Sequence, residues 1–396
     1  MTPRIAGMIV LGVDHVTRFV KFPSLIAVLM FAVGSTASGP PPAVRANATT
    51  GWVQTVAMSG SQVAYSTGAG LPYGPGDKLH LWDVRTGKSR LISAHNPDPV
   101  YEVAISGTRV SWVARGETAP DPTAELNESL FAASLRKPSR PQLLGTAYRT
   151  ESEPVVGVPR DCTGNWIGGL VGSANLLAVN RWQTARVGEV THAELDLVTS
   201  TGLRQEISGA GSIVAQSTNG GRIAVLRSTD AWPGAGDLCG ATTSPTVGLY
   251  TTTGKLLREF TVAGVREVAL SGADLVVLTK ASRLAVYDWR SGRRLNNWRV
   301  PHVSWVHLED VYGQIAVYSA YSQGRNLHLL QLATGKDVLL TKGSGLGPYY
   351  TRGDDAQLES PGLVYAVDKP GTTERGKLVF VPMRRVLAAV AKGHVR

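Results

Sequence analysis

Short apolar runs recur along this chain after residue 50, and small or polar residues separate them. β-Branched and aromatic residues fill the runs, which is typical of strands. Seven times, one run ends in a small-residue turn and the chain continues directly into a second run. These turns lie at Ser59-Gly60, Ser106-Gly107, Val171-Gly172, Gly220-Gly221, Ser271-Gly272, Tyr312-Gly313 and Pro361-Gly362. The pattern predicts seven hairpins.

The spacing of these turns indicates the architecture. The glycines at positions 60, 107, 172, 220, 272, 313 and 362 are 47, 65, 48, 52, 41 and 49 residues apart. A four-stranded propeller blade takes about 40–50 residues. Helix signals are nearly absent after residue 50. We therefore expect an all-β fold: a seven-bladed β-propeller of four-stranded antiparallel blades.

The fifth repeat shows the four strands of a blade, a to d, most clearly. We expect them at Val265–Leu270, Asp274–Thr279, Arg283–Asp288 and Leu295–Val300. A glycine marks the c–d turn in five repeats: Gly87, Gly202, Gly254, Gly292 and Gly335. The second repeat has Arg136-Lys-Pro138 there, and the seventh has Pro382-Met-Arg-Arg385. To close the ring we favour a C-terminal strand at Val386–Val390; residues 44–50 are the alternative.

A family resemblance rests on the first repeat. The segment Leu79-His-Leu-Trp-Asp-Val-Arg-Thr-Gly-Lys88 resembles the end of strand c in a WD repeat, and Tyr287-Asp288 is a weaker echo in the fifth repeat. The Gly-His pair that opens a WD repeat is missing throughout. Residues 51–390 thus resemble the WD-repeat and TolB-like class of β-propellers. The resemblance implies a fold and a habit of binding partners, and it transfers no catalytic residue.

The N-terminus resembles an export signal. Arg18 and Lys21 precede the apolar stretch Leu25–Val33, and small residues and three prolines follow. This order is typical of a secretory signal, and the apolar core is short for a membrane-spanning helix. We expect residues 1–46 to be a signal peptide or N-terminal anchor with a Pro-rich linker, and residues 47–396 to form one propeller domain. The protein would then be secreted or held in the cell envelope.

Charge and cysteines agree with export. The formal net charge is +10, which suits an anionic partner or serves solubility alone. Cys162 and Cys239 both lie in polar, glycine-bearing segments. In an oxidising compartment two such cysteines most simply form a disulfide. Two free thiols, or half of a metal site, are the alternatives.

The long connections all belong to one face. The a–b and c–d turns of a propeller share one face, and the b–c and d–a connections share the other. The long segments are 67–77, 115–128, 145–164, 181–192, 228–245 and 341–355, all of the second kind. We expect binding there, because loops on a rigid scaffold commonly carry function. The candidate contact residues are Tyr73, Asp77, Arg160, Trp166, Trp182, Asp230, Trp232, Asp237, Tyr349, Tyr350 and Arg352. Aromatic rings beside charges suit peptide or carbohydrate recognition, and packing under the loops is the alternative role for each Trp.

Sequence motifs for catalysis are absent. The chain has no Gly-x-Ser-x-Gly, no His-Glu-x-x-His and no phosphate-binding loop. We therefore assign no catalytic residue, cofactor or metal site, and we expect a monomer that binds no nucleic acid. The favoured function is an exported binding or scaffold protein whose partner is a protein, a peptide or an anionic envelope polymer. A secreted glycoside hydrolase or lyase with carboxylates at the central funnel is one alternative, and a purely structural propeller is another.

Overall fold

A computed structural model of the chain describes residues 45–48, 52–68, 78–92, 100–118, 123–152, 162–173, 176–184, 190–199, 204–209, 212–219, 221–228, 246–301, 305–321, 325–342, 356–368 and 376–395. All of these belong to one compact unit, residues 42–396. Residues 1–44 of the expected signal or anchor segment lie outside the described residues, whereas Arg45 and Ala46 belong to the strand Arg45–Ala48, which pairs within the propeller. No helix within the described ranges is long and apolar enough to cross a membrane.

The described chain forms seven antiparallel blades, and each runs from an innermost strand outward. Blade 1 consists of β2 (Trp52–Ser59), β3 (Gln62–Gly68), β4 (Lys78–Asp83) and β5 (Ser89–Leu91). Blade 2 consists of β6 (Val100–Ser106), β7 (Arg109–Thr118), β8 (Thr123–Ser134) and β9 (Gln142–Ser152). Blade 3 consists of β10 (Cys162–Ser173), β11 (Leu176–Thr184), β12 (Val190–Thr199) and β13 (Arg204–Gly209).

The remaining blades follow in chain order. Blade 4 consists of β14 (Ser212–Asn219), β15 (Arg222–Ser228), β16 (Thr246–Thr251) and β17 (Leu256–Thr261). Blade 5 consists of β18 (Val265–Ser271), β19 (Asp274–Thr279), β20 (Arg283–Asp288) and β21 (Arg294–Arg299). Blade 6 consists of β22 (Trp305–Tyr312), β23 (Ile315–Tyr321), β24 (Arg325–Gln331), β25 (Lys336–Lys342) and the short β29 (His394–Val395). Blade 7 consists of β26 (Ala356–Glu359), β27 (Gly362–Asp368), β28 (Gly376–Pro382) and β1 (Arg45–Ala48).

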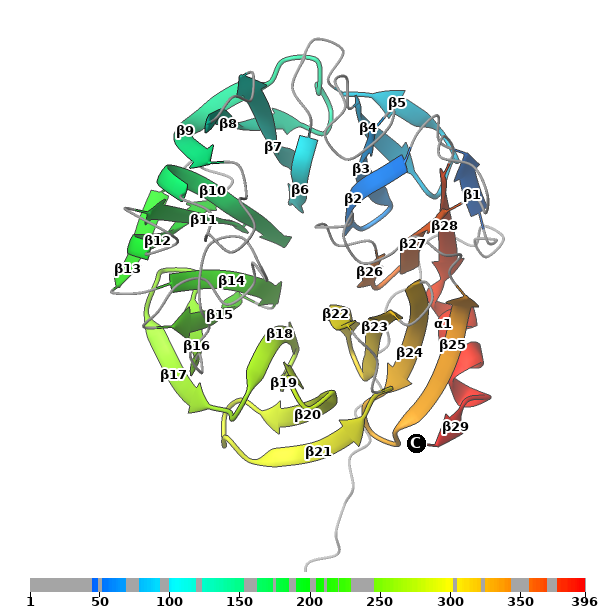
Figure 1. Ribbon diagram of the computed structural model, residues 1–396. Helices are drawn as coiled ribbons and strands as arrows, with labels where there is room; N and C mark the ends of the chain where they lie inside the picture. The colour runs from blue at the N-terminus through cyan, green and yellow to red at the C-terminus, as the bar shows by residue number, and fades with distance from the viewer. Residues whose placement is uncertain are drawn as a thin grey trace, which may run out of the picture. The chain divides into compact units, whose positions relative to one another are not determined.

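The seven blades close into a ring. Each innermost strand contacts the innermost strands of both neighbouring blades, including β2 with β26. Figure 1 shows these strands around the centre of the disc, with the later strands of each blade toward the rim. The predicted seven-bladed, four-stranded architecture is therefore confirmed. In blade 5, the bounds predicted for β19 and β20 agree with the structure to the residue.

The ring closes from the N-terminal side. β1 pairs with β28, so that Arg45 lies opposite Phe380 and Ala48 lies opposite Lys377. The favoured closure by a C-terminal strand is wrong, because residues 386–390 are helical. They belong to α1 (Met383–Ala391), whose buried Val386 and Val390 pack between blades 6 and 7. The valines suggested a strand, but their four-residue spacing places both on one face of a helix.

The hydrophobic core lies between the blades. There are seven described clusters of buried apolar side chains, and each joins two neighbouring blades. The blades are thus apolar on both faces, which explains why many strands read as continuous apolar runs and not as strict alternation. Trp82, Trp112 and Tyr318 are among the largest fully buried side chains.

Glycines shape the tight turns. The c–d turn glycines at 87, 254, 292 and 335 all have φ between 72° and 78°, a conformation that costs other residues free energy. Gly202 lies outside the described residues. Gly172 was assigned to an a–b turn, but it lies inside β10 opposite Leu177, and the turn follows Ser173. A Cβ at Gly172 would lie 2.4 Å from the backbone oxygen of Ile105, so glycine is needed there for close approach of β10 to β6.

Blades 2 and 3 form one continuous sheet. The end of β9 pairs with the start of β10, with Glu151 opposite Cys162 and Arg149 opposite Gly164. Much of two segments expected to be long loops, 115–128 and 145–164, is therefore strand. β7 and β8 stay paired as far as Thr118 and Glu125. We call the end of the disc with the a–b and c–d turns the tight-turn face, and the opposite end the long-loop face.

Candidate functional site: the long-loop ends of the inner strands

The candidate site begins at irregularities in the innermost strands. Six of these strands carry a register shift in their pairing with the second strand of the blade. The residues left outside the ladder are Gln54, Tyr101, Gly168, Gln216, Arg266 and Glu309. A β-bulge leaves one residue unpaired and redirects its neighbours. Tyr101 and Arg266 are the second residues of β6 and β18, at the long-loop end, whereas Glu309 lies near the middle of β22.

Glu128 connects blade 2 to blade 3. Its side chain is fully buried and forms an ion pair with Arg115, with 2.6 Å between Oε1 and Nη2. The other carboxylate oxygen accepts the backbone N–H of Ile167 in β10 at 2.6 Å. The Arg115 guanidinium also lies over the ring of Tyr101, 4.0 Å from its centroid. The buried Glu128 carboxylate therefore positions both the Arg115 guanidinium and the backbone of β10 in the next blade.

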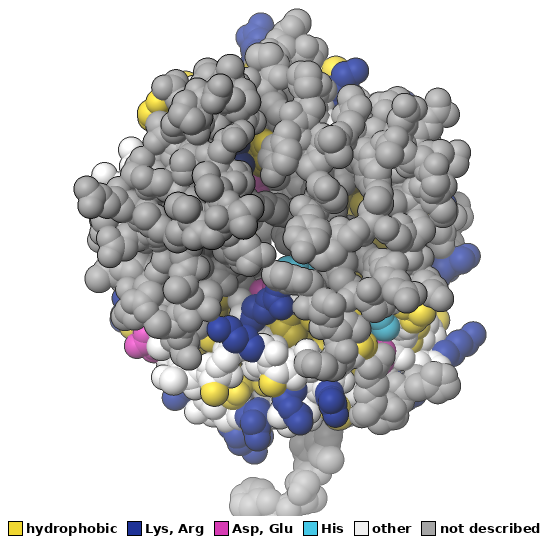
Figure 2. Space-filling view, in the orientation of Figure 1, with side chains coloured by type: hydrophobic (Ala, Val, Ile, Leu, Met, Phe, Trp, Pro, Cys, Tyr) yellow, Lys and Arg dark blue, Asp and Glu magenta, His cyan; other side chains and the backbone are white. Residues whose placement is uncertain are grey.

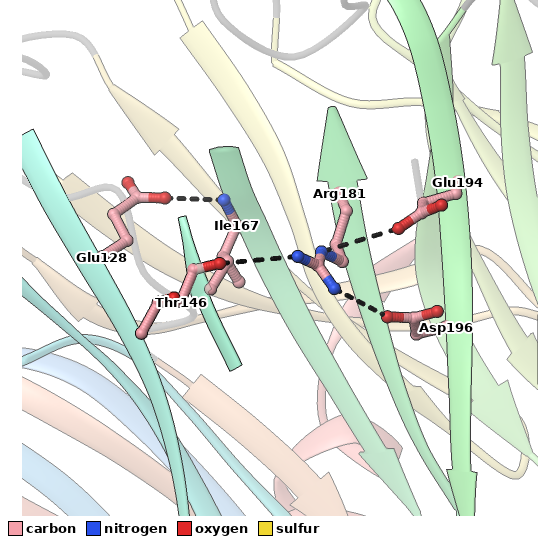
Figure 3. A network of polar contacts seen from close by, with 6 residues as sticks. All are labelled: Glu128, Thr146, Ile167, Arg181, Glu194 and Asp196. Atoms are coloured by element: carbon pink, nitrogen blue, oxygen red, sulfur yellow. Dashed lines mark hydrogen bonds and ion pairs between the residues drawn. The ribbon is translucent and has the colours of Figure 1, made fainter. Parts of the chain in front are cut away.

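Arg181 makes a second bridge between the same blades. Figure 3 shows its guanidinium between Glu194 and Asp196 of β12 on one side and Thr146 of β9 on the other. The distances are 3.6 Å to Glu194, 3.4 Å to Asp196 and 3.5 Å to the Thr146 carbonyl oxygen. The two carboxylates hold the Arg181 guanidinium in a fixed position between blades 2 and 3.

Blades 5 and 6 are joined by a carboxylate–histidine pair. Glu267 in β18 bonds Nδ1 of His307 in β22 at 2.8 Å, and its other oxygen accepts the N–H of Leu308. The His307 side chain is 40 % exposed. Burial lowers the pKa of His307, but the hydrogen bond and charge of Glu267 and the charge of Glu309 outweigh this effect and raise the pKa above its ordinary value. The imidazole is therefore more readily protonated than a free histidine.

Hydrogen bonds from a backbone N–H of one blade to a carboxylate of the neighbouring blade recur around the ring. Asp310 of blade 6 accepts the N–H of Leu358 in blade 7 at 2.8 Å, and Glu359 of blade 7 accepts the N–H of Gly60 in blade 1 at 2.9 Å. Burial raises the pKa of Glu359, although the Gly60 hydrogen bond opposes the shift. Leu358 lies on an innermost strand, which is a sheet edge whose free N–H groups need acceptors. Gly60 lies instead in the a–b turn of blade 1, on the tight-turn face. Together with Glu128 and Glu267, these carboxylates tie neighbouring blades together.

This arrangement has chemical consequences. A hydrolase at the funnel would need two carboxylates about 5–10 Å apart that exchange protons with substrate. In the described inner strands, Glu267, Asp310 and Glu359 instead accept backbone N–H groups of the next blade, and Glu309 accepts the hydroxyl of Ser319. Within the same described part of the chain, no three His, Cys, Asp or Glu side chains converge as a metal site would require.

Most residues predicted as contacts lie outside the described residues. These are Tyr73, Asp77, Arg160, Asp230, Trp232, Asp237, Tyr349, Tyr350 and Arg352, so their contact role stays a prediction. Cys239 is also outside, and the disulfide is not shown. Cys162 is the first residue of β10. Trp166 lies in β10 opposite Trp182 in β11, and the Trp182 side chain is 4 % exposed within the core between blades 3 and 4.

The sequence reasoning missed the residues that the structure brings together here. Arg115 and Glu128 were only the limits of an expected loop, and Arg266, Glu267 and His307 were given no joint role. One signal was available: inner strands β6 and β18 share the pattern Val-polar-Glu-Val, as Val100-Tyr-Glu-Val103 and Val265-Arg-Glu-Val268. A charged residue at the same position of two inner strands indicates a repeated role in the ring.

Comparison with known proteins adds little beyond the fold. No protein-family model and no curated protein sequence matches this chain. Among solved structures, the computationally designed Ika8 protein aligns with a TM-score of 0.44 and 14% identity over 84% of this chain and 97% of that one. A chain of the Mitotic Checkpoint Complex aligns with a TM-score of 0.49 and 12% identity over 95% and 99%. Neither likeness bears on function, and the strand pairing itself shows the propeller.

Proposed function

We propose that this protein is an exported binding or scaffold protein that holds a protein or peptide partner on its long-loop face. The observation that carries the proposal is the reinforced rim of blades 2 and 3. There, β7 and β8 stay paired as far as Thr118 and Glu125, and β9 pairs with β10. Blades 2 and 3 therefore form a single eight-stranded sheet. A binding site on a rigid support loses less conformational entropy when it binds.

The electrostatics of this rim support the same role. Arg115 and Arg181 are held in place by buried or half-buried carboxylates, with side chains 14% and 26% exposed. Figure 2 shows Lys and Arg side chains over blade 5, on the part of this face that described residues form. Glu128, Glu194 and Asp196 neutralise Arg115 and Arg181, so the attraction of a partner with acidic groups comes from exposed cations of blade 5 such as Arg283 and Arg299. An anionic envelope polymer is the alternative partner for the same surface.

The enzyme alternative has weaker support. The described inner carboxylates serve as acceptors between blades, which leaves them poorly placed for acid–base work. Export rests on the N-terminal sequence, and the disulfide between Cys162 and Cys239 rests on export and on the polar, glycine-bearing segments around the two cysteines. Intact-mass analysis of protein isolated from its host tests the export proposal, because signal cleavage near residue 37 removes a fixed mass and leaves β1 whole, whereas cleavage after Ala46 would cut β1.

Site-specific photo-crosslinking in the host cell tests the binding face. A photoreactive amino acid replaces Asn165 or Gln183, which are exposed near the long-loop ends of β10 and β11. Matched controls carry it at Thr253 or Thr334, exposed on tight turns of blades 4 and 6. We expect one discrete crosslinked partner from the first pair and none from the second. The same adduct from both pairs, or from the controls alone, would contradict the proposal.

A further inference from the structure

The tight-turn face is strongly basic. Its c–d turns place exposed cations at equivalent positions in separate blades: Arg85, Lys88, Arg136, Lys137, Arg290 and Arg293. Lys255 in blade 4 is exposed in the same way, and Arg384 and Arg385 extend the series at the start of α1. Equivalent turns of a propeller lie around one end of the disc. The cations therefore form a ring-shaped basic rim, although they are scattered through the sequence.

Two acidic residues of the tight-turn face accept hydrogen bonds within their own turns. Asp83 accepts the N–H groups of Arg85 and Thr86 at 2.9 and 3.3 Å. Asp288 accepts the N–H of Arg290 and the hydroxyl of Ser291, each at 2.9 Å, and these hydrogen bonds lower the pKa of its carboxyl group.

Two further acidic side chains of this face are buried. Asp274 is 9% exposed and is bonded to Gln314, and Asp337 is 8% exposed and is bonded to Tyr318. Among the side chains described on this face, none of the exposed ones is acidic. Asp83 and Asp288 keep their negative charges, but each of their turns carries two exposed cations, so the rim has a net positive charge.

One stretch of the rim is hollowed. A shallow depression of about 340 Å³ lies on blade 2 between the a–b turn and the start of β9. Arg109 and Arg140 line it together with the hydroxyl of Ser134 and the amide of Gln142. Two guanidinium groups with neutral donors suit a phosphate group, because arginine binds phosphate in a bidentate manner.

The first described strand, β1, begins on the same side. β1 begins at Arg45 opposite Phe380, near the tight-turn end of β28. The Arg45 guanidinium reaches the c–d turn of blade 1, where a Cβ on Gly87 would lie 2.6 Å from its Nη1 atom.

We propose that the tight-turn face rests on the anionic surface of a lipid bilayer, with the long-loop face directed away from it. The cations are arranged around one end of a disc. This arrangement matches a planar surface better than cations lining a single groove would. Each Lys or Arg near an anionic bilayer contributes about 1 kcal/mol, equal to about a fivefold change in binding. The six- and seven-residue strands hold the two faces about 20 Å apart, roughly twice the Debye length at 0.1 M salt. Charges on the opposite face therefore contribute little.

Vesicle co-sedimentation of the full chain tests the proposal. The probes are phosphatidylcholine vesicles with and without phosphatidylglycerol. The variant K88Q/R136Q/K137Q removes three exposed cations from the basic rim. The matched control R283Q/R299Q/K377Q removes three exposed cations from the long-loop ends of β20, β21 and β28. Every protein carries the same N-terminal segment, so the contribution of that segment cancels, and thermal unfolding shows that each variant is folded.

The expected results are specific to one face. The wild type binds vesicles that contain phosphatidylglycerol, and raised salt weakens this binding. The rim variant loses about 100-fold in partitioning, from three roughly fivefold steps, while the control stays within about threefold of the wild type. Equal losses in the two variants would show attraction by net charge without orientation and would overturn the proposal. Retention on soluble polyphosphate without vesicle binding would also overturn it, in favour of an anionic polymer.

Discussion

The substitution Glu128→Ala tests whether a buried carboxylate holds blade 3 against blade 2. It removes the partner of Arg115 and the acceptor for the Ile167 N–H at once. Removing one member of a buried ion pair costs about 3–5 kcal/mol. A buried N–H left without an acceptor costs about 1–3 kcal/mol. The two costs overlap because they share one carboxylate, so we expect a loss of about 3–5 kcal/mol in total.

Two further variants separate the contributions. Glu128→Gln keeps an oxygen that can accept the Ile167 N–H, so it should be less destabilising than Glu128→Ala. The double variant R115M/E128Q also removes the cation that would otherwise lack its carboxylate, and it should recover to within about 2 kcal/mol of the wild type. Glu194→Ala is the matched control. Its carboxylate is 3.6 Å from Arg181, which keeps Asp196 as a second partner at 3.4 Å, so the loss should be smaller than that for Glu128→Ala.

The assay is equilibrium urea unfolding at pH 7, followed by tryptophan fluorescence and by circular dichroism. Free energies of unfolding come from linear extrapolation, and unchanged slopes show that the same transition is compared. A loss below about 1 kcal/mol for Glu128→Ala would refute the reasoning, because surface substitutions alone cost that much. Equal losses for Glu128→Ala and Glu128→Gln would refute the role of the Ile167 hydrogen bond.

Three further predictions concern other parts of the molecule. Because His307 has a raised pKa in the folded protein, its contribution to stability is fully present below its unfolded pKa of about 6.5 and is lost as the pH rises through the folded value. Urea midpoints measured between about pH 6 and 8 should therefore fall more steeply for the wild type than for His307→Gln, and identical slopes would disprove this coupling. Gly172→Ala should cost about 1–3 kcal/mol, because its Cβ would meet the β6 backbone at 2.4 Å, whereas Gly145→Ala, with open space around it, should be tolerated. A loss for Gly145→Ala as large as that for Gly172→Ala would count against the close-approach explanation. Cys162 and Cys239 should resist a thiol reagent under native, non-reducing conditions and react after reduction, and modification of both without reductant would show that no disulfide is present.

Local sequence determined the blades. The strands of blade 5 and the tight turns were predictable because β-branched runs and turn glycines act over a few residues. Gly87, Gly254, Gly292 and Gly335 have the positive φ that the hairpins require. The turn predicted at Gly172 was wrong because this glycine allows a close contact between blades 2 and 3. Such a long-range contact cannot be recognised from the neighbouring residues.

Tertiary structure decided how the blades join. β1 closes the ring with a strand more than 300 positions away in the sequence, since Arg45 lies opposite Phe380. The bond between Glu128 and Ile167 likewise depends on the packing of two blades. Neither pairing can be predicted from periodicity, because each joins residues that are far apart in the sequence and come together only in the closed ring.

The sequence by itself determined the number of blades and their strand order, because these follow from a repeat of about 50 residues. Only the tertiary structure decided which charges act together. Arg85, Arg136 and Arg290 are far apart along the chain, yet equivalent turns bring them to one rim, where exposed cations outnumber Asp83 and Asp288. Ring geometry thus converts scattered charges into one basic face.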